Sequence, residues 1–466
     1  MKTLKSKIFL LSFLVPVLLF SQSAPTLKEL IDSAMVNDGN LNEQILQNRI
    51  TGLNDERLKD IFLPKVDISG KAGYMYTSAR ITTPEINFPA VPNLFPGTVI
   101  PEYSNNLNIS GITTAMKAEA SVLVYSGGKV KYLKEANKEK SLSEQKMMDK
   151  TRDEIITEIS KSYDLFALLE ESRKVLDEGK KRLDINRKTA DKALGYGLIT
   201  PYDHKKVELA QATLDSKIVE YEGKKELLIT QLHLLTGIER ERIAMIQTEL
   251  SPISYAVIDS DVDNRAEIQA LEHGIKASEY KIKAEEKWWI PKVQAQTSLS
   301  YIGLFDNHIS TSKGLMNGIG RKLDFTSSNL NIFPFFQAGI GFKWEIFDGN
   351  EGKVNIEEAR INKEILENKK KDARKKLTLN LANNQTSYEI AEAQIKLKNK
   401  ARSIAKTALE NVEKEFRYGT KKSSDLIDAE YDLENAELEY RTAIFNQRRS
   451  AVELMKSTQK LDVDKL

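Results

Sequence analysis

The chain has 466 residues, of which 29% are charged, and its 69 basic side chains nearly balance 67 acidic ones. The net charge of +2 gives no electrostatic reason to expect nucleic acid or a strongly acidic substrate as a partner. Cysteine is absent, which excludes disulfides, thiolate metal sites and thiol nucleophiles, and we expect no lipid anchor on an N-terminal cysteine.

The N-terminus has the pattern of a secretory signal peptide, which we place at residues 1–23. Lysines at positions 2, 5 and 7 precede an apolar run, Ile8 to Phe20, which is shorter than the about 20 residues that a membrane helix needs. Small and polar residues follow at 21–24, as before a cleavage site. The mature chain is therefore predicted to leave the cytoplasm.

The spacing of proline predicts two very long helices. No proline occurs between Pro101 and Pro201 or after Pro334, and proline in a helix interior costs about 3 kcal/mol. We therefore predict long helices over 129–196 and 353–418, each about 100 Å long at 1.5 Å per residue. Such lengths exclude a compact globular domain and are typical of a coiled-coil rod or tunnel.

Shorter helices complete the helical part. We predict them over 27–62, 200–247, 263–289 and 424–460, and in pairs they match the long ones in length. Heptad stripes predict close helix packing before and after the turn that joins the helices predicted over 353–418 and 424–460. The first consists of Ala401, Ala405, Ala408, Val412 and Phe416, and the second of Leu426, Ala429, Leu433, Ala436, Tyr440 and Ala443.

Four segments alternate with the period of two that is typical of strands. We place them at about 64–77, 107–125, 291–304 and 334–347, with long polar loops over 77–107 and 305–333. One face of each strand is apolar and the other polar, as in transmembrane barrels. Four strands cannot enclose a lumen, so we expect three chains to contribute twelve strands. A soluble sheet is the alternative, but it needs an apolar cover that the long charged helices do not supply.

The chain is an internal duplication. Leu63-Pro64-Lys65-Val66 recurs as Ile290-Pro291-Lys292-Val293, and Tyr196-Gly197 with Asp203 recurs as Tyr418-Gly419 with Asp425. The strand-to-helix junctions also correspond, with glycines at Gly127, Gly128 and Gly349 that permit a sharp change of direction. We therefore divide the chain into a first repeat, 24–250, and a second repeat, 251–466.

This order of elements and these motifs resemble the TolC-like outer membrane factor (outer membrane efflux protein) family over the whole mature chain. The resemblance implies an α+β membrane protein: a homotrimer with a 12-stranded β-barrel in the outer membrane, four strands per chain, continued by a long α-helical coiled-coil tunnel through the periplasm. It implies an exit duct for a tripartite efflux pump or a type I secretion system. The implied partners are a periplasmic adaptor protein and an inner-membrane RND or ABC transporter, with no cofactor.

The same resemblance implies a gate at the periplasmic tip, formed at the two helix turns around Gly197 and Gly419. By motif, Phe416 and Lys421 correspond to the aromatic and basic residues that bond to Asp203 of a neighbouring turn. Asp425 and Asp428 correspond to an acidic ring. The chain departs from the usual pattern, because Phe416 has no hydroxyl and Lys421 cannot form a bidentate ion pair. Capping of the following helices is the alternative role of Asp203 and Asp425.

Two other classes of protein are the alternatives. A secreted coiled-coil structural or adhesion protein without channel activity explains the signal and the helices, but not the duplicated strand pairs. An enzyme is disfavoured, since no nucleophile elbow, paired catalytic carboxylates or metal motif occurs, and the four histidines form no His-x-x-x-His pair. Within the efflux interpretation, export of drugs, metal ions or proteins stays open.

Overall fold

The computed structural model describes residues 23–255, 261–316, 319–458 and 461–465, so almost all of the predicted signal peptide lies outside the described residues. The chain forms two compact units, each built from separate stretches of sequence. The helical unit consists of the described residues up to Ile50, together with Ser141–Gly274 and the residues from Ile365 onward. The strand unit consists of Thr51–Lys140 and Ile275–Glu364.

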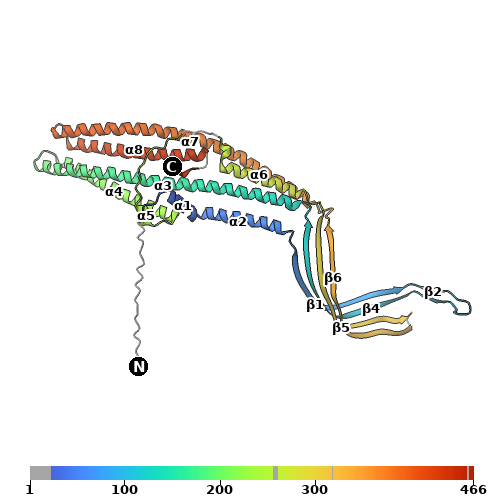
Figure 1. Cartoon of the computed structure of the whole chain (residues 1–466). Helices are drawn as coiled ribbons and strands as arrows, with labels where there is room; N and C mark the ends of the chain where they lie inside the picture. Colours follow the sequence, from blue (N-terminus) through green and yellow to red (C-terminus); the bar gives the residue numbers. More distant parts are fainter. Residues whose placement is uncertain (1–22, 256–260, 317–318, 459–460, 466) are drawn as a thin grey trace, which may run out of the picture. The chain divides into compact units, whose positions relative to one another are not determined.

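The order helix, strand, strand, long helix, shorter helix occurs twice along the chain (Figure 1). The first set is α2 (Gly39–Asp60), β1 (Lys65–Thr83), β4 (Tyr103–Tyr125), α3 (Lys129–Gly195) and α4 (Pro201–Thr236). The second is α6 (Ala266–Glu285), β5 (Lys292–Met316), β6 (Ile319–Lys343), α7 (Glu351–Arg417) and α8 (Ser423–Thr458). The other elements are α1 (Leu27–Asn37), the hairpin β2 (Ile86–Phe88) and β3 (Thr98–Ile100), α5 (Arg240–Ala244) and 3-10 turns at Val262–Asn264 and Val463–Lys465.

Both long helices are present. α3 and α7 contain 67 residues each, and their ends lie within two residues of the predicted ones. α8 begins one residue before its predicted start, and its predicted end at 460 lies outside the described residues. None of the helices in the described part of the chain combines the length and the apolar run needed to cross a membrane.

Two predicted helices are divided, so those predictions were wrong in detail. The helix predicted over 27–62 breaks at Asp38, whose extended backbone caps α1 and whose carboxylate accepts a hydrogen bond from the Leu41 N–H at 2.6 Å. The helix predicted over 200–247 ends at Thr236, because Gly237 takes the left-handed conformation that terminates helices. Both breaks depend on local capping chemistry.

The helical unit has an apolar core between α1, α3 and α4. Leu30, Ile159, Phe166 and Leu232 are almost completely buried there. A smaller cluster joins α7 and α8 near the second turn, where Leu409 contacts the predicted stripe of α8. Phe416 packs against this cluster, as the stripe predicts.

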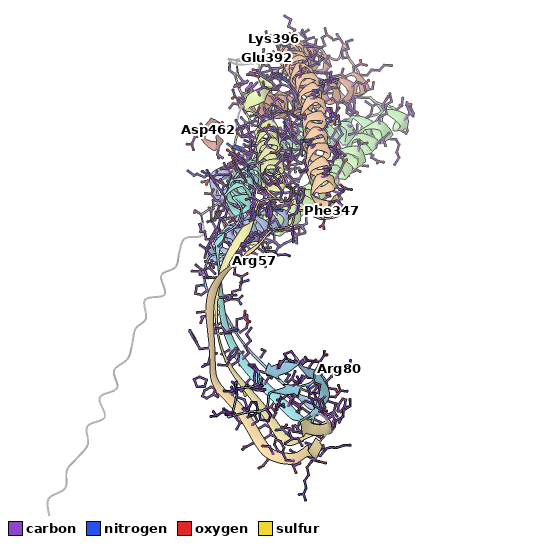
Figure 2. The ribbon with its side chains drawn as sticks, turned by 90° about the vertical axis from the view of Figure 1, so that its right-hand side faces the viewer. Arg57, Arg80, Phe347, Glu392, Lys396 and Asp462 are labelled. Carbon is purple, nitrogen blue, oxygen red and sulfur yellow. The ribbon has the colours of Figure 1, made fainter. Side chains whose placement is uncertain are left out.

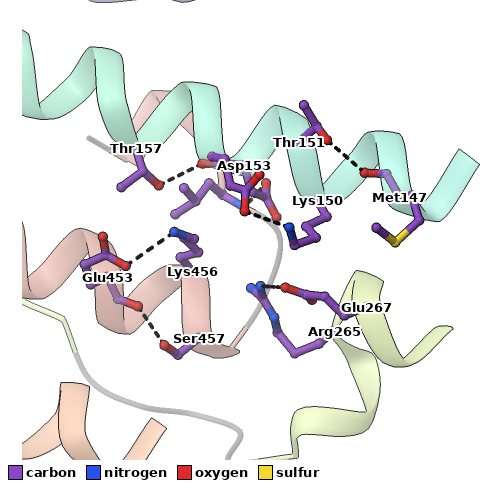
Figure 3. Close-up of polar contacts among 12 residues, drawn as sticks. Met147, Lys150, Thr151, Asp153, Thr157, Arg265, Glu267, Glu453, Lys456 and Ser457 are labelled. Carbon is purple, nitrogen blue, oxygen red and sulfur yellow. Dashed lines mark hydrogen bonds and ion pairs between the residues drawn. The ribbon is translucent and has the colours of Figure 1, made fainter. Parts of the chain in front are cut away.

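Polar contacts support the region where the end of α8 approaches α3 (Figure 3). Asp153 is buried, and its carboxylate accepts a hydrogen bond from the Leu461 N–H at 3.2 Å. Arg265, at the start of α6, forms an ion pair with Glu267 at 2.8 Å, and only 5% of the Arg265 side chain is exposed. Each of these buried charges therefore has a polar partner, as burial in a low dielectric requires.

The strand unit contains one antiparallel sheet in the order β1-β4-β5-β6. Its strands have 19, 23, 25 and 25 residues, so the predicted strands were too short. The predicted loop over 305–333 is wrong, since β5 and β6 continue through most of it. The predicted loop over 77–107 is strand at both ends, with the β2–β3 hairpin between them. The predicted end of the fourth strand at 347 is also wrong, because β6 ends at Lys343.

A first prediction concerns the core of the helical unit. Phe166 has 0% of its surface exposed, and truncating a buried phenylalanine typically costs about 3–5 kcal/mol. We expect Phe166→Ala to lower the free energy of unfolding of the detergent-solubilised protein by that amount, measured by denaturant unfolding. Phe166→Leu is the matched control and should lose about 1 kcal/mol, since it keeps most of the packing. Equal losses in the two variants would contradict the assigned core position.

Candidate functional site

The candidate site lies at the two turns of the helical unit, α3 to α4 and α7 to α8, which we call the paired turns (residues 193–203 and 415–428). In the first, the Leu198 N–H donates to the Ala193 carbonyl at 2.8 Å and the Gly197 N–H to the Leu194 carbonyl at 3.0 Å. This is the Schellman pattern that ends helices. Gly197 has φ of 71°, a conformation that glycine adopts without strain.

The second turn repeats this geometry. The Thr420 N–H donates to the Glu415 carbonyl at 2.9 Å and the Gly419 N–H to the Phe416 carbonyl at 3.0 Å. Gly419 has φ of 72°. The internal duplication therefore extends to the hydrogen bonds of the turns, which places the residues after each glycine equivalently.

After the first turn, Asp203 completes a capping box. The Asp203 N–H donates to the Thr200 hydroxyl oxygen at 3.1 Å, and the Thr200 N–H donates to an Asp203 carboxylate oxygen at 3.3 Å. The Thr200 hydroxyl also donates to this carboxylate at 2.7 Å. These hydrogen bonds hold the pKa of Asp203 below its usual value, with a further contribution from the positive charge of Lys422. Asp203 is thus a fixed negative charge at the start of α4.

Asp425 takes the equivalent position at the start of α8. Its carboxylate accepts a hydrogen bond from the Lys422 N–H at 3.1 Å. The predicted capping role is therefore present at both aspartates. Capping also fixes the direction in which each carboxylate points, so it is compatible with a role at the turns.

The structure brings three predicted residues together in one groove between α7 and α8. Lys421, Asp425 and Asp428 line this open groove of about 600 Å³, with small apolar side chains from α7 opposite them. Asp428 also lines a second groove, of about 410 Å³, with Lys206 and Arg182 from the first pair of helices. Phe416 lies at the apolar cluster beside the first groove.

The groove between α3, α4 and α8 contains a partly buried glutamate. Glu430 accepts a hydrogen bond from the Asn186 side chain at 2.7 Å, and its burial raises its pKa to about 7. The charge of Arg182 opposes this shift, whereas the nearby carboxylates of Glu413 and Glu434 add to it. The contact between the first and second pairs of helices near the turns therefore contains a group that titrates near neutral pH.

The strand-to-helix glycines belong to the strand unit. Gly127, Gly128 and Gly349 all have positive φ, at 70°, 83° and 70°. A Cβ on Gly127 would also lie 3.1 Å from the Ile290 side chain, so the junction leaves little space for one. These positions take the conformation that their sequence predicts. Asn350, which has φ of 72°, was not predicted.

Sequence reasoning missed Lys422 and Glu430. By the offset between the repeats, Lys422 is equivalent to Thr200 and Glu430 to Glu208. An alignment of the two turns could therefore have singled out Lys422. The burial of Glu430 depends on the approach of α3, and no local pattern indicates it. Within the described residues, no group of three His, Asp or Glu side chains is arranged to hold a metal ion.

Comparisons with known proteins find the same combination of a four-stranded sheet and long helices. The family model for outer membrane efflux proteins matches residues 257–458. No curated protein sequence matches the chain at a significant level.

Solved structures match over nearly the whole chain. A crystal structure of CusC matches with 14% sequence identity and a TM-score of 0.70, and the match covers 93% of this chain and 92% of CusC. The outer membrane protein VceC of Vibrio cholerae has 15% identity and a TM-score of 0.67, covering 93% of this chain and 97% of VceC. The CmeC outer membrane channel of Campylobacter jejuni has 15% identity and a TM-score of 0.68, covering 94% of this chain and 88% of CmeC.

These comparisons agree with the resemblance: the model for outer membrane efflux proteins matches residues 257–458, and the solved structures share the fold over nearly the whole chain. They confirm its fold class, in which a small sheet per chain is continued by long helices. The predicted location, the outer membrane, is also that of the proteins that the matching family model describes.

A second prediction concerns the turn glycines. We expect Gly197→Ala and Gly419→Ala each to destabilise the protein by about 1–2 kcal/mol, the cost of a Cβ in the left-handed conformation. Gly223→Ala is the control, since Gly223 lies within α4 and a Cβ there meets nothing within 4 Å; it should stabilise by up to about 1 kcal/mol. Denaturant unfolding measures all three, and a neutral effect at both turns would contradict this role.

A third prediction concerns pH. The pKa of Glu430 is about 7 in the folded chain against an ordinary value of 4.5. The folded state therefore holds a proton that the unfolded state releases, so this stabilisation is complete below pH 4.5 and is lost as the pH rises through 7. We expect Glu430→Gln to reduce the loss of thermal stability between pH 4.5 and pH 8, whereas the exposed control Glu410→Gln should not. An unchanged pH dependence in Glu430→Gln would contradict the assignment.

Proposed function

We propose that three copies of this chain form a passive outer-membrane exit duct for a tripartite efflux pump or a type I secretion system, gated at its periplasmic end. The duct performs no catalysis. The copies pool their strands into one twelve-stranded barrel, and their helices form a tunnel in the periplasm.

The main support for this proposal is the open edges of the four-stranded sheet. Its outer strands, β1 and β6, each pair on one side only within the chain, so each leaves a row of backbone donors and acceptors without a strand partner. Lipid does not tolerate such edges, and pairing β6 with β1 of the next copy removes them. The large apolar side chains on one face support a lipid contact, since Ile68 is 76% exposed, Ile340 77% and Phe342 73%.

The paired turns of the helical unit support a gate. We propose that Asp425 and Asp428 of three copies form an acidic ring, and that Phe416 and Lys421 of one copy contact Asp203 of the next. The low pKa of Asp203 and the common groove of Lys421, Asp425 and Asp428 support this arrangement. Lys422 lies near enough to Asp203 within one chain to add to the same electrostatic contact.

The proposed partners follow from this role. A periplasmic adaptor protein would dock on the helical tunnel and connect it to an inner-membrane RND or ABC transporter. The transporter would supply the energy, and the duct would supply a wet path whose polar lining includes Asp67, Glu119 and Gln294.

A fourth prediction tests the duct and its gate together. We expect the purified protein to form discrete channels in planar bilayers that are blocked by multivalent cations. The double variant Asp425→Ala/Asp428→Ala should weaken this block at least tenfold in blocker concentration, because the carboxylates that attract the cation are removed. Asp372→Ala, which removes an exposed aspartate of α7 away from the turns, is the control and should keep the block.

The outcomes separate the proposals. Channels with unaltered block in the double variant would keep the duct and reduce the aspartates to helix caps. No channels from folded protein extracted from outer membranes would contradict the duct and favour a helical structural or adhesion protein.

A further inference from the structure

The sheet of the strand unit changes direction part-way along its strands (Figures 1 and 2). The pairing of β4 with β5 shifts by one residue between Ser110 and Ile112, a β-bulge opposite Asp306 and Asn307. A Cβ on Gly111 would lie 2.5 Å from the Asn307 amide oxygen, so only glycine fits there. We call the part of the sheet before the bulge the proximal sheet (65–76, 112–125, 292–305 and 329–343) and the part beyond it the distal sheet (77–83, 103–110, 308–314 and 322–327).

In the proximal sheet, the two faces follow the barrel pattern. Residues paired across strands share a face. One such row is Ile68, Ala118, Leu299 and Phe336, and the next row, on the opposite face, is Asp67, Glu119, Ser298 and Gln337. The apolar face is the proposed lipid face, and the polar face is the proposed lining of the lumen.

In the distal sheet, the polarity of the two faces is inverted. β1 pairs with β4 without any shift, so its faces continue through the bend. The row that continues the lipid face is Ser78, Asn108, Ser310 and Asp324, whereas the row that continues the lumen face is Thr77, Ile109, Ile309 and Phe325. The lumen face already becomes apolar just before the bend, where Ile302 pairs with Ile332 and Leu304 with Leu330.

The polar face of the distal sheet is suited to water. The Ser78 hydroxyl donates to the Asn108 side chain at 2.7 Å, and His308 lies 3.5 Å from Asp324. Arg80 is on the same face and donates to Asn106 at 3.5 Å; Figure 2 shows it at the far end of the sheet. These contacts would be costly in lipid, so the distal sheet lies beyond the membrane.

The length of the apolar band agrees with this boundary. On β1 the apolar side chains extend from Val66 to Tyr76, which matches the about 9–11 residues that a tilted strand needs to cross a membrane. The polar face of the distal sheet begins directly afterwards, at Ser78. The bulge therefore lies at the outer boundary of the membrane band.

The distal sheet also curves toward its apolar face. Asn307 and Thr311 lie on the same face as Ile309 and are 1% and 8% exposed, whereas the adjacent residues Asp306 and His308 are exposed. Side chains on the inside of a bend are the more buried ones. At the bend, the buried side chains therefore lie on the face that continues the lumen face.

We propose that the apolar faces of the three distal sheets pack against one another over the lumen and close the outer mouth of the duct. This inference rests on the proposed trimer. The apolar face of each distal sheet would be covered by the second and third copies of this chain. β1 and β6 are the outer strands of the distal sheet as well as of the proximal sheet. Pairing of β6 with β1 of the next copy in the barrel therefore places each distal sheet beside the next. Phe325 is 44% exposed and Ile81 51% exposed in one chain, which leaves apolar surface for this contact.

Such a closure is a hydrophobic gate. Narrow apolar constrictions exclude water and therefore ions, although they carry no charge. The duct would then have two barriers of different chemistry, with carboxylates at the periplasmic turns and aliphatic side chains at the outer mouth. Apolar or amphiphilic cargo would pass the second barrier more readily than ions.

The fifth prediction tests this contact by cysteine chemistry, which the cysteine-free chain permits. Ile309→Cys and the matched neighbour Ser310→Cys, on the opposite face, would be reconstituted as full-length protein in phosphatidylethanolamine–phosphatidylglycerol vesicles. With a short bis-maleimide we expect covalent dimers from Ile309→Cys and none from Ser310→Cys. With a membrane-impermeant polyethylene glycol maleimide we expect Ser310→Cys to react at least tenfold faster. The double variant Ile109→Asn/Ile309→Asn should raise channel open probability severalfold, whereas Ser310→Asn should not.

Each outcome decides between the proposals. Channels and trimers in the wild type, with equal labelling of both cysteines and no dimers from Ile309→Cys, would overturn the closure and keep the duct. The same holds if the asparagine double variant conducts like the wild type. If the wild-type protein forms neither trimers nor channels, the proposed duct is contradicted, and the proposed closure is contradicted with it.

Discussion

The structure of the strand unit depends on one constraint, the need of edge strands for backbone partners. A sheet of four strands leaves β1 and β6 each with one unpaired edge, and an outer membrane offers no water to hydrogen-bond them. In the proposed trimer, pairing between copies satisfies these groups and determines the number of strands, the presence of a lumen and the direction in which each face points. The same trimer accounts for the alternation of Lys65, Asp67 and Ser69 with Val66 and Ile68, because the polar residues would line a wet path and the apolar ones would contact lipid.

The helical end follows a different constraint, the unsatisfied carbonyl and amide groups at helix termini. Gly197 and Gly419 terminate the long helices with the same hydrogen bonds, and Asp203 and Asp425 cap the returning helices. The carboxylates at the turns are therefore held by the backbone and not by flexible side-chain contacts alone. This explains how one residue type can both stabilise a helix start and present a fixed negative charge at the tip.

The sequence predicted the helices well and the strands less well. Proline-free stretches and the Tyr-Gly motifs located α3 and α7 within two residues, because proline and glycine act locally. The sequence predicts loops beyond residue 77 and within 305–333, because the apolar and polar faces of these strands change places at the bulge beside Gly111. Strands are predicted from alternation that keeps one apolar face along the whole strand, so each predicted strand ends where the two faces exchange polarity. Polar residues such as Asn106 and Asn108 then look like loop residues, although cross-strand partners satisfy them.

By itself, the sequence determined the element types, the duplication and the candidate residues at the turns, since periodicity, proline and glycine act over a few residues. Only the tertiary structure decided which charges meet. The proximity of Lys422 to Asp203, the burial of Glu430 beside Arg182, and the bend built on Gly111 and Asn307 all join segments far apart in the chain. Their energies depend on burial and on distances between segments, and neither quantity is encoded by local pattern.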